Sequence, residues 1–235
     1  MSGVTLTKTS HKATEIPGLD SRTKKYILAS TGALTLWSIF SSVLSAGAIS
    51  AIIITFILYT FYWGYALVTK NPLVLRLLIF GTIAGLLELF ADNYLVHNID
   101  SLVYPEGELM IWSSPVYMPF AWSNVLTQLG FIGILLSRKY NLWVASALLA
   151  IAGGMYIPLY EYLAEGANWW VYKNNVIMIF NAPLYVILCE AFIAFSLPFL
   201  ITYATRHHWQ RTIPLGIAEG AWIMLGVIVT YAIAG

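Results

Sequence analysis

Charged residues are scarce in this sequence. They make up 10% of its 235 residues, while 59% are hydrophobic and the mean hydropathy is +0.75. Soluble globular domains contain about 25% charged residues. This chain has less than half of that proportion, so its composition excludes an ordinary soluble domain. It predicts an integral membrane protein surrounded by the lipid bilayer.

Cysteine and histidine are scarce as well, and neither sign of charge is in clear excess. A single Cys excludes a disulfide framework and any site with several thiolates. Four His residues do not favour a three-histidine metal centre, and no paired aspartates for a Mg²⁺-bound diphosphate and no GxSxG or HExxH motif occur. Twelve Lys and Arg against eleven Asp and Glu leave a net charge of +1. We therefore expect no metal, no other cofactor and no nucleic-acid partner.

Long apolar runs are abundant by contrast. A helix needs about 20 mostly apolar residues to cross the hydrocarbon core. We expect a bundle of seven transmembrane helices at residues 26–46, 49–68, 73–90, 115–136, 142–160, 176–203 and 213–233. The third run can extend to residue 96, and Pro183 and Pro198 are expected to bend the sixth. No internal repeat or linker is recognisable, so residues 26–235 should form one transmembrane domain behind a polar tail at residues 1–25.

The positive charges predict how the bundle is oriented. With seven spans, eleven of the twelve Lys and Arg residues lie on the side of the N-terminal tail, and only Lys173 lies on the other. Cytoplasmic loops carry an excess of Lys and Arg. We therefore expect a cytoplasmic N-terminus and a non-cytoplasmic C-terminus. The tail is not expected to be a cleavable signal peptide, because it has no apolar core.

Acidic residues inside the expected spans are the candidates for chemistry. A charge at mid-bilayer costs roughly 2.5–3.5 kcal/mol, so such residues persist when they face a cavity, pair or hold a proton. Glu88 and Asp92 are four residues apart on one helix face, where two carboxylates should not both ionise. One of them can then keep its proton and act as a general acid. Glu190 and Glu161 are further catalytic candidates, whereas Glu219 is expected to serve helix packing.

Aromatic and amide side chains near these acids are the candidates for substrate binding. They are Tyr117, Trp122, Asn124, Gln128, Tyr156, Tyr160, Trp169, Asn181 and Tyr185. Tyr117, Asn124 and Gln128 share one stripe of the fourth span, and Asn181 shares a face of the sixth with Tyr185. Aromatic faces stabilise cations, although aromatics at this depth are also ordinary interfacial anchors. Acids among aromatics in a dry pocket suit a reaction that protonates an alkene or epoxide and shelters the carbocation.

Two enzyme families resemble this sequence. The length, the seven-span layout and the acids at non-cytoplasmic helix ends resemble the small membrane-bound terpene cyclases of meroterpenoid pathways. This resemblance implies that Glu88 protonates an epoxide or alkene, with Asp92 or Glu190 as its partner. The segments at 85–90 and 155–163 are similar to helices of emopamil-binding-protein-type sterol isomerases, which pair a His with a Glu one turn later. Ala84 stands at that His position here.

A third resemblance adds no function: the segment SPVYMPFAW at residues 114–122 is similar to one in an uncharacterised bacterial seven-helix family. Three function hypotheses therefore stay open. The first is a membrane enzyme that cyclises or isomerises an apolar isoprenoid or lipid after protonation by Glu88. The second is a proton-coupled transporter or lipid-binding protein, and the third is a structural or assembly subunit. The acids and the two enzymatic resemblances together favour the first.

Overall fold

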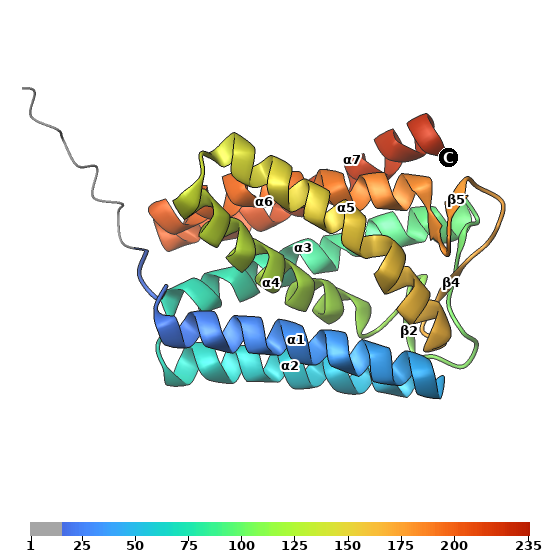
Figure 1. Cartoon of the computed structure of the whole chain (residues 1–235), viewed down its shortest axis with the longest axis horizontal. Helices are drawn as coiled ribbons and strands as arrows, with labels where there is room; N and C mark the ends of the chain where they lie inside the picture. Colours follow the sequence, from blue (N-terminus) through green and yellow to red (C-terminus); the bar gives the residue numbers. More distant parts are fainter. Residues whose placement is uncertain (1–15) are drawn as a thin grey trace, which may run out of the picture.

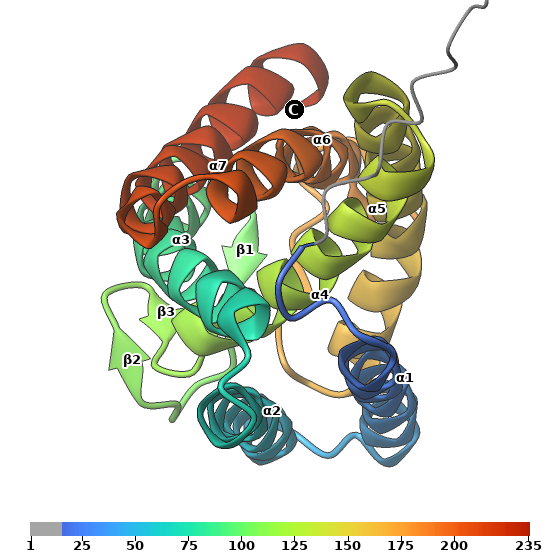
Figure 2. The same ribbon diagram turned by 90° about the vertical axis from the view of Figure 1, so that its left-hand side faces the viewer.

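The computed structural model describes residues 16–235, and seven helices in this range are long and apolar enough to cross a membrane. They are α1 (Ser21–Leu44), α2 (Ala48–Val68), α3 (Pro72–His97), α4 (Met118–Lys139), α5 (Leu142–Gly166), α6 (Leu184–Arg206) and α7 (Thr212–Ala234). Figure 1 shows the helices alongside one another, and Figure 2 looks along the bundle with α4 near its middle. The predicted set of seven apolar helices, typical of a multi-pass membrane protein, is confirmed. The first fifteen residues of the predicted tail lie outside the described residues.

Side-chain caps set where three of the helices begin. Asp20 precedes α1 and accepts a hydrogen bond from the backbone N of Thr23 at 2.6 Å. Asn71 precedes α3 and accepts from two backbone N–H groups of the first turn, and Asn141 does the same for one N–H group of α5. The first N–H groups of a helix have no partner inside it, so these caps satisfy them. Pro72 follows Asn71, where the helix needs no donor.

Most predicted helix ends lie within about three residues of the observed ones, but α1 begins at Ser21 and not at residue 26, and the largest difference is at the start of the sixth helix. α3 runs through to His97, as its apolar pattern allowed, and α5 extends to Gly166. α6 begins at Leu184, so the predicted start at residue 176 is wrong. Residues 178–183 form a short hairpin instead, and Pro183 precedes α6 as its N-cap residue. Apolar strand residues directly before a helix extend its apolar run, and composition alone does not separate the two.

Six two-residue strands lie at one end of the bundle, called the hairpin end below; the opposite end, where α1 begins, is called the N-terminal end. The antiparallel pairs are β1 (Leu102–Val103) with β4 (Val171–Tyr172), β2 (Met110–Ile111) with β3 (Ser114–Pro115), and β5 (Met178–Ile179) with β6 (Ala182–Pro183). The β1–β4 pair joins the loop between α3 and α4 to the loop between α5 and α6. The two loops therefore form one layer across the ends of these four helices.

The structure overturns the expectation that the chain has no internal repeat. The order α3–β1–β2–β3–α4 recurs as α5–β4–β5–β6–α6. A constant offset along the chain pairs identical residues: Val103 with Val171, Tyr104 with Tyr172, Met110 with Met178, Ile111 with Ile179, Pro115 with Pro183, and Tyr117 with Tyr185. Trp112 and Phe180, which the same offset relates, both have a positive φ, of 60° and 54°. The recurring element order and these identities at one offset together reveal the repeat.

The two units meet at equivalent positions. Val103 and Val171, which the constant offset relates, are paired with each other between β1 and β4. The first helix of each unit, α3 or α5, runs from the N-terminal end to the hairpin end, so the repeat is parallel and not inverted.

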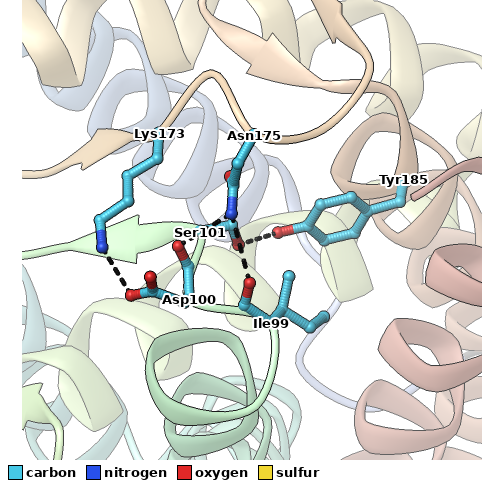
Figure 3. A network of polar contacts seen from close by, with 6 residues as sticks. All are labelled: Ile99, Asp100, Ser101, Lys173, Asn175 and Tyr185. Carbon is cyan, nitrogen blue, oxygen red and sulfur yellow. Dashed lines mark hydrogen bonds and ion pairs between the residues drawn. The ribbon is translucent and has the colours of Figure 1, made fainter.

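Polar contacts hold the two hairpin-end loops together (Figure 3). Lys173 Nζ lies 2.5 Å from Asp100 Oδ1, and the backbone N of Lys173 donates to the Ser101 carbonyl at 2.7 Å. The hydroxyl groups of Ser101 and Tyr185 are 2.6 Å apart and buried. The Asn175 amide donates to two backbone carbonyls of the opposite loop, at 3.4 and 3.2 Å. These contacts fix the start of α6 relative to the loop that follows α3.

Glycines bring the two long helices of each unit into close contact. A Cβ at Gly85 of α3 would overlap the Pro119 carbonyl oxygen of α4. At Gly153 of α5, the equivalent position of the second unit, a Cβ would lie 3.1 Å from the Ala194 Cβ of α6. Both units therefore have their close approach at the same position, and the absence of a side chain there is what permits it.

Substituting Gly85→Ala is expected to lower the unfolding free energy by about 1–3 kcal/mol, because the methyl group fits only if α3 and α4 move apart. The control is Gly64→Ala in α2, where a Cβ would meet nothing within 4 Å. Ala is the better helix former, so this variant should be as stable as the unaltered protein or up to about 1 kcal/mol more stable. Thermal unfolding in lipid or detergent, followed by circular dichroism, compares the variants. A Gly85→Ala variant as stable as the unaltered protein would contradict the close approach.

Candidate functional site

A cavity of about 380 Å³ lies inside the bundle, toward the hairpin end. Residues from α1, α3, α4, α5, α6 and α7 line it, together with residues of the hairpin-end loops. Small-ligand sites commonly measure about 300–1,000 Å³ and are lined mainly by apolar and aromatic side chains with a few polar groups. The size and lining of this cavity therefore fit a small apolar ligand.

Four carboxyl groups face this cavity. Glu88 and Asp92 come from one face of α3, Glu161 from the last turns of α5 and Glu190 from the first half of α6. Glu88 and Asp92 are 2% and 4% exposed. A buried carboxyl group without hydrogen bonds is costly, so the partners of these groups matter.

Two of the four carboxyl groups are held by donors from the hairpin-end loops. Asp92 Oδ2 accepts hydrogen bonds from the Tyr104 hydroxyl at 2.5 Å and from Ser114 Oγ at 2.7 Å. Glu161 Oε2 accepts from the indole N–H of Trp170 at 2.6 Å. Glu88 differs, because its buried Oε2 has no hydrogen-bond partner among the described residues. Glu88 therefore has one carboxyl oxygen free to interact with a bound molecule.

Two equivalent tyrosines line the cavity from the hairpin end. Tyr104 follows β1 and Tyr172 ends β4. Burial raises the pKa of both hydroxyl groups well above the ordinary value, so both stay protonated and remain hydrogen-bond donors. The Tyr104 hydroxyl already donates to Asp92.

Nine of the thirteen predicted site residues line the cavity. They are the acids Glu88, Asp92, Glu161 and Glu190 and the side chains of Trp122, Gln128, Tyr156, Tyr160 and Tyr185. Trp122 is offset from the predicted stripe of α4 and nevertheless reaches the cavity. Gln128 also donates to the Tyr62 hydroxyl at 2.8 Å, which fixes the direction of its amide.

The other four predicted binding residues are not among the cavity-lining residues. Tyr117 is buried in a separate apolar cluster near α2 and the end of α5. Asn124 donates to the Thr55 carbonyl of α2 at 2.9 Å. The prediction that Asn181 shares a helix face with Tyr185 is wrong, because Asn181 precedes α6 and donates to Glu165 at the hairpin end.

Trp169 also lies outside the cavity. Its indole N–H donates to Ser50 Oγ of α2 at 2.8 Å, while the adjacent Trp170 turns inward to Glu161. Sequence reasoning therefore selected the wrong member of this Trp pair for the cavity. It also missed Tyr104 and Tyr172, although the repeated Val-Tyr dipeptide marks both of them.

In the part of the chain that the structure describes, no group of three or more His, Cys, Asp or Glu side chains is placed to hold a metal ion. The four cavity acids come from three helices and are distributed around an apolar and aromatic space. Chemically, this arrangement can offer a proton from one group, accept a proton at another and surround a positive charge with aromatic faces.

Comparison with known proteins identifies a family but no function. No curated protein and no solved structure matches the chain. A family model described as Domain of unknown function (DUF6989) matches residues 89–234, which is more than half of the chain. The match runs from the residue after Glu88 to the last residue of α7 and includes Asp92, Glu161 and Glu190. The chain belongs to the DUF6989 family.

Proposed function

We propose that this protein is a multi-pass membrane enzyme that starts the cyclisation or isomerisation of an isoprenoid or related apolar lipid by protonating it. The observation that carries the proposal is the Glu88 carboxyl group, which lies in an apolar and aromatic cavity with one oxygen unpartnered among the described residues. Asp92, one turn away, is held by two loop donors and keeps a fixed position beside it.

In the proposed reaction, Glu88 gives its proton to an alkene carbon or an epoxide oxygen. In an alkene, the π electron pair forms the new C–H bond and leaves a carbocation at the neighbouring carbon. In an epoxide, an oxygen lone pair forms the new O–H bond, and the C–O bond then breaks with its electron pair going to oxygen, which leaves a carbocation. The faces of Trp122 and Tyr160 stabilise this cation within the cavity. The reaction ends when a carboxylate, Glu190 or Glu161, removes a proton from the neighbouring carbon and a new alkene forms. One proton enters and one leaves, so the product is an isomer of the substrate.

The residues between α1 and α5 that line the cavity are evidence for a lipid substrate. Thr31 and Thr35 of α1 and Tyr156 of α5 all line the cavity. Tyr156 is also 39% exposed on the outer surface, and Met155 beside it is 76% exposed. A lipid would therefore reach the cavity from the bilayer, between α1 and α5.

The distribution of charge supports the proposed orientation. Apart from Lys173, every Lys and Arg in the described residues lies at the N-terminal end, near the end of a helix or in a connection. The loop acids Asp100, Glu106 and Glu108 lie at the hairpin end. We infer a cytoplasmic N-terminal end, with the hairpin end and the C-terminus on the opposite side of the membrane.

A proton-coupled carrier is the second candidate. The parallel repeat favours it, because several transporter folds are built from parallel repeats with their binding site between the units. Such a carrier would move a molecule across the bilayer without changing it, whereas the proposed enzyme changes its connectivity.

Substituting Glu88→Gln is expected to leave the fold intact and to abolish turnover, because the amide keeps the shape of the side chain and cannot donate the acid proton. Proton transfer by a positioned group contributes about 10²–10⁴-fold to a rate. The unaltered protein and the variant are expressed in a host rich in isoprenoids and epoxidised isoprenoids. Their lipid extracts are compared by mass spectrometry for a compound of unchanged mass and shifted retention.

The matched control is Glu106→Gln, since Glu106 is an exposed loop acid outside the cavity. It should form the isomer at the normal level. Full activity of the Glu88→Gln variant would contradict the proposal that Glu88 protonates the substrate. Absence of any isomer with well-folded protein would count against the enzyme, and a pH-driven movement of an unchanged lipid in proteoliposomes would establish the carrier.

Substituting Tyr104→Phe is expected to lower the isomer yield about tenfold or more, because a hydrogen bond to a charged group contributes about 1.5–3 kcal/mol. The loss would leave Asp92 with one donor instead of two. Tyr172→Phe is the matched control, at the equivalent position of the second unit. It should change the yield less, because the Tyr172 hydroxyl is not among the donors to Asp92. Equal yields from both variants would contradict a special role for the Tyr104 hydroxyl.

A further inference from the structure

Glu219 is a buried acid that the proposed reaction does not use. It lies in α7 and is fully shielded from solvent. Its Oε2 accepts a hydrogen bond from Ser196 Oγ of α6 at 2.6 Å, and its buried Oε1 has no partner among the described residues. Helix packing requires no carboxyl group with a free oxygen, and burying one is costly.

Glu219 lies between two hollows of the bundle. Leu215, Glu219, Ile223 and Val227 follow one another at four-residue spacing and share one stripe of α7. Ile223 and Val227 line the cavity that holds the four acids. Leu215 lines a second hollow, of about 450 Å³, at the N-terminal end. The position of Glu219 is therefore one helical turn from each of them.

α6 repeats this arrangement beside α7. Glu190 and Ile193 line the acid-bearing cavity, and Tyr203 lines the second hollow. Ser196, which holds Glu219, lies between them and also donates to the Ile193 carbonyl. The residues that line the second hollow include the polar Thr202, Arg206 and His207.

One acid of the cavity is linked to Glu219 through α6. Glu190 lies on the helix whose Ser196 donates to Glu219, and its charge acts on the Glu219 carboxyl group. On the other side, α7 packs against apolar side chains of α3: Gly216 meets Phe80 and Ile83, and Gly220 meets Leu87. These contacts of α7 with α3 are apolar, so the acid that acts on Glu219 comes from α6.

We propose that Glu219 is a proton relay that connects the second hollow at the N-terminal end with the acids of the cavity. This deepens the proposed function, on which it rests, by naming the route of its protons. At the end of a turnover Glu190 holds the proton that it removed from the substrate, and Glu88 is a carboxylate. Glu190 passes its proton to the free oxygen of Glu219, which releases it at the N-terminal end. A proton that enters by the reverse steps passes through Glu190 to Glu88, which lines the same cavity. Both acids then return to their starting state, and no proton is consumed overall.

The test needs no substrate, so it is separate from the test of the enzyme. The purified full chain in lipid nanodiscs is transferred from H₂O to D₂O at acidic pH, where carboxyl groups hold protons. Infrared spectroscopy follows the carbonyl band of the buried protonated carboxyl groups, and the part of the band that disappears in Glu190→Gln reports Glu190. In Glu219→Gln, this part is expected to exchange about tenfold or more slowly than in the unaltered protein, because the amide cannot pass the proton on.

Two further variants keep the result interpretable. Glu219→Asp retains a carboxyl group and should exchange at a rate near that of the unaltered protein. Glu219→Leu removes the carboxyl group together with the cost of burying it, so this variant should fold well. Its Glu190 proton should exchange slowly. This variant replaces Glu219→Gln in the test if Glu219→Gln does not fold. Exchange of the backbone amides, measured in the same spectra, should be equal in all variants.

Exchange of the Glu190 band at the normal rate in Glu219→Gln or Glu219→Leu would overturn the relay. Slowing of the backbone amides by the same factor would also overturn it, because the effect would then be a general stiffening of the protein. Neither result would bear on the isomer formed in the expression host, which tests Glu88 alone. A relay failure and an enzyme failure are thus distinguishable.

Discussion

The cost of burying carboxyl groups is the constraint on which this structure depends. An acid in an apolar interior is tolerated only when it is hydrogen-bonded or keeps its proton. Asp92 and Glu161 are stabilised by donors that come from the hairpin-end loops, chiefly Tyr104 and Trp170. The strand pairs and the contacts between the two loops hold these donors over the cavity. Glu88 keeps an oxygen without a partner among the described residues, and the proposed function assigns the reacting proton to it for this reason.

The parallel repeat provides two similar walls that carry different chemistry. Tyr104 and Tyr172 occupy equivalent positions, and both line the cavity. The position that Glu190 holds in the second unit is held by Trp122 in the first. Equivalent backbone positions therefore present an acid in one unit and an aromatic ring in the other. This asymmetry suits a substrate that exchanges protons at one point and carries a positive charge at another.

The helices were predictable because the length of an apolar run is a property of each segment by itself. The start of α6 was not predictable in this way, since the hairpin before it is apolar as well and Pro183 is compatible with either structure. The repeat was not predicted because most equivalent residues of its two units differ in type. The two units have the same order of helices and strands, which becomes visible only in the structure.

The sequence by itself determined the membrane class, the seven helices and the acids within them, because hydrophobic length and the cost of a charge in lipid depend on local composition. Only the tertiary structure decided which side chains share the cavity. Asn124 faces α2 through its bond to Thr55, and Trp169 binds Ser50 while Trp170 binds Glu161. Each choice depends on a partner on another element, and the partners of Asn124 and Trp169 are distant in the sequence. The direction of a polar side chain in a bundle is set by the helix or loop that packs against it, and local sequence does not contain that information.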